Sequence, residues 1–399
     1  MRTAAVVGCG VGGMGAALAL ARRGIEVTLF ETFEAPRPLG SGLLLQPTGL
    51  AALGRLGLGE PVRAVGARID RLEGHDVQGR LVLKTEYRHW RPDAHGIGIH
   101  RAQLFQILFE ALAPAGVELR VGTTIEDVRE LARPVLVDAI GASHGPFDLA
   151  VIADGSGSRL RSKLRPKARA PVNPWGAVWG NLPDSEGRFA GVLAQVYDRA
   201  EVMIGVLPIG LGPDPGAGRQ VSLFWSLPSI DAPTFGACDF EAWKARVRAL
   251  WPAAGELAAG FADAAQLAPA IYRDVSVGAW NTGATVLIGD AAHGTSPQLG
   301  QGANLALVDA VELADRFAVG GSVSVSLQAY QAARRRHTAI YQLASRLLTP
   351  LFQSRGRFWS AVRDWVFTPL SLLPGLRTLG AGMLTGSLRL GPWPKTLRP

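Results

Sequence analysis

The stretch TAAVVGCGVGGM at residues 3–14 decides the fold of this chain. Its first five residues are β-branched or small and apolar, which favours a buried strand. The residues from Met14 to Arg23 favour a helix, and Gly24 ends it. A second apolar run, Val27 to Phe30, follows and ends at Glu31. Strand, glycine-rich turn, helix and strand in this order predict a βαβ unit, whose parallel strands must be covered on both faces.

The glycines of this stretch match the pattern GxGxxG where the strand gives way to the helix. Gly8 would permit the tight turn, Gly10 would let a pyrophosphate approach the backbone, and Gly13 would let the helix pack closely on the strand. The helix N-terminus would face the negative charge. Glu31 would accept hydrogen bonds from ribose hydroxyls. The pattern predicts a dinucleotide site without separating NAD from FAD, and a glycine-rich turn without a ligand is the alternative.

Composition narrows the class of protein. The chain has 399 residues, 48% of them hydrophobic, so it can bury a core in two domains or in one large interleaved unit. Cys9 and Cys238 lie far apart in the sequence, which argues against a disulfide framework or a zinc site and favours a reducing cytoplasm. We therefore expect no metal. The recurring glycines and Glu26 argue against a signal peptide, and no apolar run is long enough to predict a transmembrane helix.

The net charge of +8 is concentrated near the end of the chain. From Leu351 onward, seven basic residues stand against one acidic residue, Asp364, which leaves a charge of +6 in this segment. The basic residues are Arg355, Arg357, Arg363, Arg377, Arg389, Lys395 and Arg398. No zinc finger, RNA-binding signature or basic stripe with interleaved aromatic residues accompanies them, so we expect no nucleic-acid partner.

The order of segments predicts an α/β fold in which one domain interrupts another. Helical and buried-strand patterns between residues 97 and 170 belong with the βαβ unit. From about Pro171 to Arg273 the chain is rich in tryptophan, proline and short alternating segments, which favours an antiparallel sheet. We expect a Rossmann-like domain with a parallel sheet at 1–73, 97–170 and 274–348, an antiparallel β-sheet domain at 74–96 and 171–273, and a C-terminal helical segment at 349–399.

Two later motifs each follow a predicted buried strand. One is DGSGSRLR at residues 154–161, and the other is GDAAH at 289–293, which continues through Pro297 to GQGAN at 300–304. With these motifs the chain resembles the para-hydroxybenzoate hydroxylase-like FAD-dependent monooxygenases, also called class A, over nearly all of its length up to Leu348. The loop RPLGSGLLLQP at 37–47 is similar to the branch that contains the phenazine hydroxylases.

The resemblance implies a non-covalent FAD and assigns roles around it. Asp290 would accept hydrogen bonds from the ribityl chain, and the helix that starts at Gly300 to Ala303 would face the flavin. Pro297 would form a wall beside the ring, Arg101 would approach the pyrophosphate or the adenosine, and Val128 would offer its backbone to adenine. The implied FAD residues are Gly8, Gly10, Val11, Gly12, Gly13, Glu31, Arg37, Ser41, Gly42, Arg101, Val128, Asp154, Gly155, Asp290, Pro297, Gly300, Gln301, Gly302 and Ala303.

Two motif residues have simpler alternatives. Asp154, which together with Arg161 would serve the FAD pyrophosphate and the nicotinamide cofactor, could instead only cap a helix. His293 invites a role as acid or base, but in this motif a structural role is favoured, so we assign it none.

The resemblance also implies the reaction. NADPH or NADH would bind transiently and reduce FAD, and the reduced flavin would react with O2 to a hydroperoxide that transfers one oxygen atom to an aromatic or other electron-rich, lipophilic substrate. The sheet domain would face the flavin and supply the substrate contacts, each of which could also be core or surface. The candidates are Gln46, Trp179, Gln195, Tyr197, Trp225 and Pro297. Leu193, Gln195 and Tyr197 share one face by their period of two. No catalytic base is chosen among Tyr197, Tyr272, His95 and His89.

Other functions and partners remain open on the sequence. An FAD-dependent reductase or dehydrogenase without oxygen insertion, or a flavin-binding protein without turnover, would carry the same motifs. The chain could be a monomer or a homodimer. Its basic, apolar C-terminal segment could rest on an anionic membrane, which would add a peripheral location to the cytoplasmic one, or could pack as a helical cap with a solvated basic face.

Overall fold

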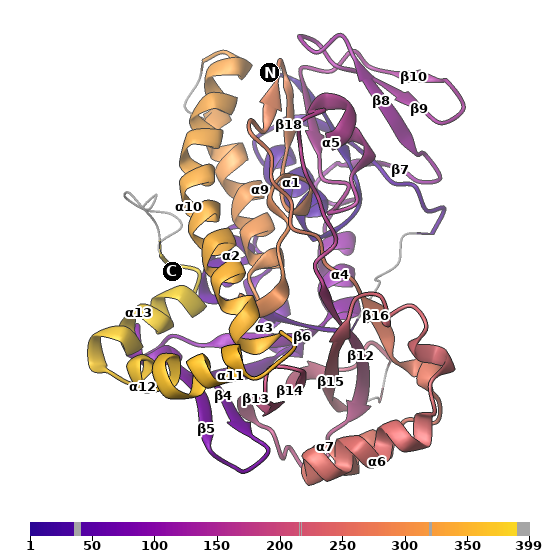
Figure 1. Cartoon of the computed structure of the whole chain (residues 1–399). Helices are drawn as coiled ribbons and strands as arrows, with labels where there is room; N and C mark the ends of the chain where they lie inside the picture. Colours follow the sequence, from indigo (N-terminus) through magenta and orange to yellow (C-terminus); the bar gives the residue numbers. More distant parts are fainter. Residues whose placement is uncertain (36–40, 215, 217, 319–320, 389–399) are drawn as a thin grey trace.

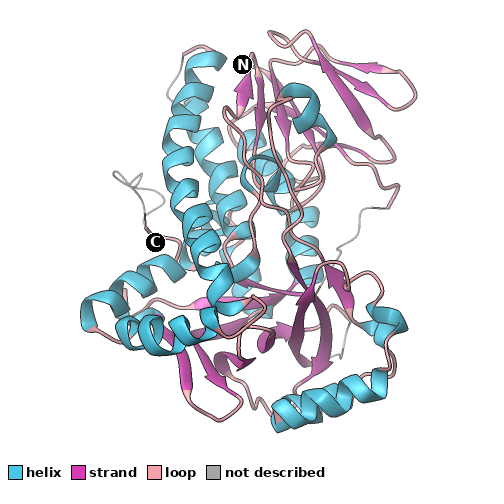
Figure 2. Ribbon diagram, viewed as in Figure 1, coloured by secondary structure: helices cyan, strands magenta, loops and turns pink. Residues whose placement is uncertain are grey.

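A computed structural model describes residues 1–35, 41–214, 216, 218–318 and 321–388 of the chain. Two large sheets dominate it, the parallel sheet in the upper half and a nine-stranded sheet in the lower half of Figures 1 and 2. Arg37 lies outside the described residues. No helix in the described part is long and apolar enough to cross a membrane.

The upper sheet has six strands in the order β17-β18-β11-β1-β2-β7. All neighbours are parallel except β17 and β18 at one edge. The bounds are β1 Thr3–Val7, β2 Glu26–Phe30, β7 Glu118–Arg120, β11 Leu149–Ile152, β17 Asn281–Thr282 and β18 Thr285–Leu287. The central strands β11 and β1 are apolar and buried apart from Thr3, as parallel strands covered on both faces must be. This confirms the predicted βαβ unit and the return of the chain to it near residue 285.

Helices and a small sheet cover the parallel sheet. The helices are α1 Val11–Ala21, α2 Pro47–Arg55, α3 Gly59–Val65, α4 Arg101–Glu110, α5 Arg159–Leu164, α8 Asp290–His293, α9 Gly302–Ala318 and α10 Val323–Phe352. Helix α1 packs tightly on α9, because a Cβ on Gly12 or Gly15 would lie within 3.3 Å of an alanine of α9. The small sheet has the order β10-β9-β8, formed by Ser143–His144, Val135–Asp138 and Ile125–Arg129. Ile125, Val128 and Leu136 of this small sheet belong to the hydrophobic core that surrounds the parallel sheet.

The lower sheet is antiparallel except where β13 pairs with β4. Its strands, in the order β16-β12-β15-β14-β13-β4-β6-β3 with β5 beside β4, are Ala268–Ala270, Trp175–Pro183, Arg219–Pro228, Val202–Leu211, Gly191–Asp198, Ala67–Asp76, Gly96–His100, Gly42–Leu45 and Leu81–Glu86. Helices α6 Phe240–Leu250 and α7 Pro252–Ala258 cover its outer face.

Strands β3, β4 and β6 lie in this lower sheet, although most of their residues fall in ranges that the sequence assigns to the FAD-binding domain. Strands β3 and β6 are short and contain glycine, so their own pattern points to neither sheet. A Cβ on Gly98 would lie 1.9 Å from the carbonyl oxygen of Pro208, and one on Gly42 would lie 2.6 Å from Ile209. Glycine at both positions lets β3 and β6 cross close over β14.

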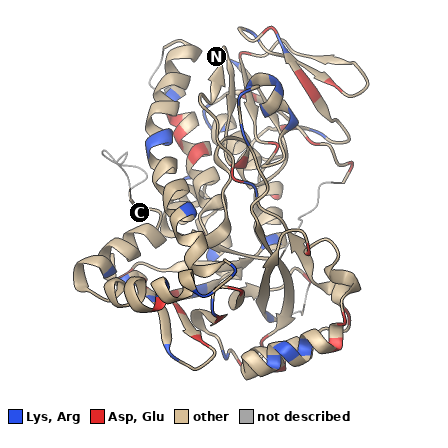
Figure 3. Ribbon diagram, in the orientation of Figure 1, with Lys and Arg blue, Asp and Glu red and all other residues tan. Residues whose placement is uncertain are grey.

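The C-terminal segment is helical, as predicted. It contains α11 Phe358–Val362, the π-helical turn η5 Arg363–Phe367, α12 Thr368–Ser371 and α13 Pro374–Leu384. These short helices lie against the hairpin of β4 and β5 at the lower left of Figure 1, and Figure 3 shows few charged residues on them. The chain then returns to α10, where Leu388 N–H donates to the hydroxyl of Tyr341.

Candidate active site

The loop from β1 to α1 has the shape that a pyrophosphate requires. Gly8 has φ +103°, and a Cβ there would lie 2.6 Å from the carbonyl oxygen of Ala153. A Cβ on Gly13 would lie 1.8 Å from the oxygen of Gly8, so the helix packs directly on the strand. Gly10, in contrast, has no atom within 4 Å of a Cβ position, and no side chain caps α1. The first N–H groups of α1 are therefore free to bind an anion.

Glu31 closes this loop from the end of β2. One carboxylate oxygen accepts from the N–H of Cys9 at 2.7 Å and the other from the N–H of Phe33 at 3.0 Å. A carboxylate has about four acceptor positions, so further ones remain for ribose hydroxyls.

The segment after β11 turns toward the same edge of the sheet. The Oδ1 atom of Asp154 is buried without a hydrogen-bond partner, and burial raises the pKa of this carboxyl. Ser158 caps α5, since its hydroxyl accepts from the N–H of Arg161 at 2.9 Å. Asp154 is therefore not the cap residue of this helix. The buried guanidinium of Arg161 donates to the carbonyl of Ala291 at 3.2 Å, which ties this segment to the one after β18.

The segment after β18 presents Asp290 at the start of α8. The Asp290 carboxylate faces a cavity, and desolvation by the surrounding protein raises its pKa. Its Oδ1 atom lies 3.7 Å from the Cβ position of Gly302, at the start of α9. Gly300 has φ +59°, which favours glycine. The Asp290 carboxylate can accept hydrogen bonds from ligand hydroxyls. The N-terminus of α9 beside it favours negative charge on a ligand ring that accepts electrons.

A cavity of about 530 Å³ lies between the two large sheets. Its polar side carries Arg101, Ser156, Arg273, Asp290 and the backbone from Gly300 to Ala303. Its apolar side is lined by Leu72, Leu83, Trp179, Leu193, Tyr197, Met203, Leu207, Phe224 and Phe352. Such a cavity can bind a polar cofactor on its polar side and an apolar compound beside it on its apolar side.

Comparison with known proteins identifies the group of enzymes that has this arrangement. A family model described as an FAD binding domain matches residues 1–342. The chain belongs to this family, and it is an FAD-dependent monooxygenase of class A. A 3-amino-4-hydroxybenzoate 2-monooxygenase of Streptomyces cremeus is 30% identical, with 86% of each chain covered. An aurachin C monooxygenase/isomerase of Stigmatella aurantiaca is 27% identical, over 92% of this chain and 94% of that one. Among solved structures, the tetrameric form of 2-methyl-3-hydroxypyridine-5-carboxylic acid oxygenase matches with a TM-score of 0.79 at 23% identity, and covers 99% of this chain and 100% of that chain.

The residues of the monooxygenase fit FAD at the site just described. Gly10 leaves open space in front of a helix N-terminus, Asp154 has a buried oxygen without a partner, and Asp290 faces the cavity. The pyrophosphate would lie at Gly8 to Gly13, with Val11 and Gly12 in the first turn of α1, and the ring system would lie along Pro297 and Gly300 to Ala303. Arg101, Ser41 and Gly42 also line the cavity. Val128 is buried in β8 and does not line the cavity.

The structure brings most of the substrate candidates together. Trp179, Gln195, Tyr197 and Pro297 line the cavity, and Leu193 lies beside Gln195 and Tyr197 as their spacing predicts. Two candidates lie elsewhere. Trp225 packs on Trp243 of α6, with ring centres 6.1 Å apart, on the outer face of the lower sheet. Gln46 is fully buried behind Gly300, where its carbonyl accepts from the hydroxyl of Tyr87 at 2.6 Å.

Among the four candidate bases, Tyr197 and Tyr272 line the cavity, whereas His89 and His95 do not. Burial raises the pKa of Tyr272 to about 12 and that of Tyr197 further. Both phenols are therefore neutral at physiological pH and act as hydrogen-bonding groups. The indole N–H of Trp179 donates to the Tyr272 hydroxyl at 3.2 Å.

The sequence analysis did not select Met203, Phe224, Arg273 or Phe352, which also line the cavity. Met203 lies on β14, which is apolar on both faces, so its side of the sheet could not be told from the pattern. Phe224 shares its face of β15 with Ser222 and Ser226, and this more polar face could have indicated the cavity side. Phe352 ends α10, four residues beyond the range 274–348 that the sequence assigns to the Rossmann-like domain. A hydrophobic repeat continued past Leu348 could have indicated it.

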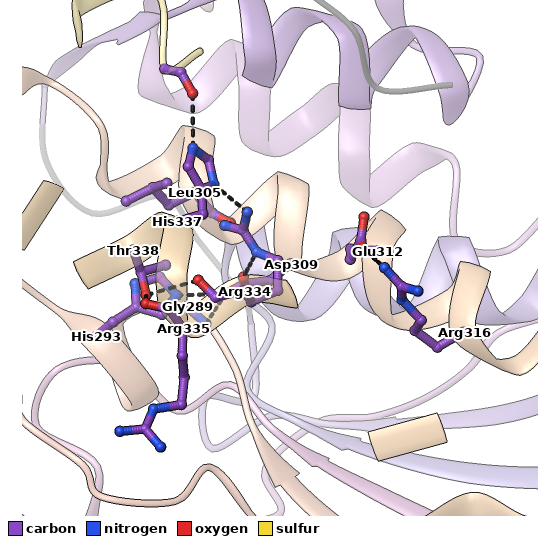
Figure 4. Close-up of polar contacts among 11 residues, drawn as sticks. Gly289, His293, Leu305, Asp309, Glu312, Arg316, Arg334, Arg335, His337 and Thr338 are labelled. Atoms are coloured by element: carbon purple, nitrogen blue, oxygen red, sulfur yellow. Dashed lines mark hydrogen bonds and ion pairs between the residues drawn. The ribbon is translucent and has the colours of Figure 1, made fainter. Parts of the chain in front are cut away.

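His293 belongs to a buried network rather than to the cavity. Its Nε2 atom donates to Asp309 at 2.6 Å, and Asp309 also accepts from the N–H of Gly289 at 2.8 Å and from Arg334 at 2.6 Å (Figure 4). Opposite charges hold the pKa of the Asp309 carboxyl well below its usual range, against the effect of burial. Arg334 also donates to Nδ1 of His337. This network fixes the turn that carries Asp290.

Proposed function

We propose that this monooxygenase hydroxylates an uncharged, planar and lipophilic aromatic compound. The observation that carries the proposal is the division of the cavity. Among its described lining residues, the ionisable groups are Arg101, Arg273, Asp290 and the two tyrosines. The carboxylate and both arginines belong to the polar side, because Arg101 interacts with Asp290 and Arg273 lies beside Arg161. A charged substrate would lose its hydration on the apolar side without gaining a partner.

Two neutral donors remain for a substrate. The Gln195 carbonyl accepts from the Tyr197 hydroxyl at 2.8 Å, which leaves the Gln195 amide N–H groups facing only the sulfur of Met203 at 3.6 Å. The Tyr272 hydroxyl accepts from Trp179 and keeps its own proton to donate. Both donors suit a carbonyl, a ring nitrogen or a hydroxyl group of the substrate.

The chemistry divides between the cofactor and the chain. Bound FAD, reduced by NAD(P)H, lets O2 give one atom to the substrate and the other to water. The chain holds the substrate ring among Trp179, Tyr197 and Phe224, and its apolar wall keeps water away from the reacting atoms. It also keeps Tyr272 protonated as a donor.

The substrate class can be tested with matched pairs of compounds. Bicyclic phenols and hydroxyquinolines would be compared with the same compounds carrying one carboxylate. The neutral member should stimulate NAD(P)H oxidation with little peroxide release and should take up one atom from labelled O2. A preference for the carboxylated members would refute the proposed class. Oxidation of the substrate without labelled oxygen in the product would refute hydroxylation itself.

A further inference from the structure

The C-terminal helices carry a group of exposed apolar side chains, which we call the C-terminal apolar surface. It consists of Phe358, Trp359, Trp365, Val366, Leu370, Leu373, Leu376 and Leu379. Trp365 is 81% exposed and Phe358 is 69% exposed. Isolated apolar residues are common on protein surfaces, but eight large ones within 22 consecutive residues mark a binding surface.

The opposite side of these helices is firmly packed. Val362 and Phe367 pack on the core beneath the lower sheet, and the Thr368 hydroxyl donates to the carbonyl of Val82 at 2.7 Å. The buried guanidinium of Arg363 donates to the carbonyl of Arg199 at 2.6 Å and lies over the ring of Tyr197. These contacts fix the orientation of the helices, so the C-terminal apolar surface faces away from the core.

Charge around this surface favours a negatively charged partner. Arg346, Arg355, Arg357 and Arg377 are exposed on the same part of the chain. Between residues 343 and 388 the single acidic residue is Asp364, and it is paired with the buried Arg363. Tryptophan, leucine and arginine side chains together suit the boundary between lipid headgroups and acyl chains.

A second copy of the chain fits this surface less well. A two-fold dimer places the same patch of both subunits face to face, so arginines would meet arginines without intervening carboxylates. The short helices, in contrast, can lie flat in a bilayer surface, since each presents only one side. We propose that the C-terminal apolar surface docks the monooxygenase on the surface of an anionic lipid bilayer.

Docking would bring the cavity close to a lipophilic substrate in the bilayer. This role of docking rests on the proposed function. Phe367, on the inner face of the segment, packs edge-on against Phe352 with ring centres 5.9 Å apart. Phe352 lines the cavity and contacts Tyr197. One layer of side chains thus separates the docked surface from the apolar wall of the cavity, so a lipophilic compound dissolved in the bilayer would have a short path to the site.

The docking can be tested by sedimentation of the FAD-loaded full chain with vesicles. Phosphatidylcholine vesicles would be compared with vesicles containing about one third phosphatidylserine, at low and high salt. We expect binding to the anionic vesicles that weakens with salt, because screening reduces the attraction between arginines and headgroups. The double variant Trp365→Gln/Leu373→Gln should weaken binding about tenfold or more, since two buried apolar side chains are lost.

Matched variants distinguish binding through this surface from non-specific binding of exposed apolar or basic residues to vesicles. Ile140 and Ile230 are 90% and 82% exposed elsewhere, and Ile140→Gln/Ile230→Gln should leave vesicle binding unchanged. Arg355→Gln/Arg357→Gln should weaken binding, whereas Arg335→Gln/Arg336→Gln, roughly 25 Å away along α10, should not. FAD content and turnover with a water-soluble substrate should stay at the level of the unmodified chain in all four variants.

Two results would overturn the proposal. One is equal sedimentation of the unmodified chain with and without anionic vesicles. The other is a dimer in solution that Trp365→Gln/Leu373→Gln converts to a monomer, which would assign the surface to a second copy. Neither result depends on which substrate is hydroxylated, so the proposed function is tested separately.

Discussion

At the scale of single residues, the Asp290 carboxylate is the strongest test of the cofactor site. Asp290→Ala removes an acceptor that faces the cavity, and hydrogen bonds to a charged group contribute about 1.5–3 kcal/mol. We expect FAD affinity to fall roughly 10- to 100-fold, measured by flavin fluorescence titration and by the ratio of flavin to protein absorbance. Asp70→Ala, which removes an exposed carboxylate of the lower sheet, is the control and should retain flavin.

Gly10 tests the pyrophosphate loop independently of folding. Its Cβ position is open in the chain itself, so Gly10→Val should leave the melting temperature of the flavin-free protein nearly unchanged. The added side chain would instead occupy the space in front of α1 and weaken FAD binding by at least about tenfold. An unchanged FAD affinity would show that the pyrophosphate lies elsewhere.

Tyr272 gives a prediction about pH. Burial raises its pKa to about 12, so the neutral phenol is favoured in the folded state. The stabilisation this gives is complete below the unfolded pKa of about 10 and is lost as pH rises through the folded value. We expect Tyr272→Phe to remove one late-titrating phenol from the alkaline absorbance titration at 295 nm. Titration of this phenol near pH 10 would contradict its burial.

At the scale of elements, the network around Asp309 joins α8, α9 and α10. Asp309→Asn would leave Arg334, which is fully buried, without its charged partner, and should destabilise the fold by about 3–5 kcal/mol. Because the folded pKa of Asp309 is lowered, its contribution is present above the unfolded pKa of about 4 and is lost at lower pH. Urea unfolding between pH 3 and 7 should show the difference shrinking with acid.

A control for this network exists on the same helix. Asp315 forms half-exposed ion pairs with Arg23 and Arg55, and pairs of this kind contribute at most about 1 kcal/mol. Asp315→Asn should therefore be mild. Equal effects of the two substitutions would mean that the Asp309 network is not a special determinant of stability.

The elements that the sequence predicted well are those with a strong local pattern. Continuous apolar strands and a glycine-rich turn depend on neighbouring residues, so β1 and β2 were found within one residue and α1 within three. The sheet to which β3 and β6 belong depends on distant contacts of Gly42 and Gly98, and no local signal reports these. Trp225 is a different case, because its strand alternates. Val221, Leu223, Trp225 and Leu227 share one face and Ser222 and Ser226 lie on the other, so the period of two could have placed Trp225 on the face that α6 covers.

At the scale of the whole molecule, the motifs predicted much of the polar side of the cavity, to which we assign the cofactor, but little of its apolar side. The glycines and carboxylates of the FAD side lie at the ends of parallel strands, where topology alone brings them together. The apolar wall instead combines β4, β5, β12 to β15 and the end of α10. Its composition follows from the tertiary packing of these elements, so the substrate class could be proposed only once the cavity was seen.

The segment around Leu384 and Gly386 packs against Gln301 and α10. The Gln301 amide donates to the carbonyl of Leu384 at 2.6 Å, and the carbonyl of Gly386 accepts from Nε2 of His337 at 2.9 Å. Arg334 contacts Nδ1 of the same His337 ring, so the ring lies between Arg334 and the Gly386 carbonyl. The loop that we assign to the flavin therefore depends on a segment about 80 residues further along the chain.

That dependence sets an order of events during biosynthesis. A nascent chain that has just passed residue 348 already displays all three motifs, yet the carbonyls that hold Gln301 and His337 are still to be translated. We expect such a truncated chain to bind FAD weakly when it is purified, in a flavin titration beside the full chain. Tight capture of the flavin would then wait until the segment with Leu384 and Gly386 has folded against Gln301 and His337.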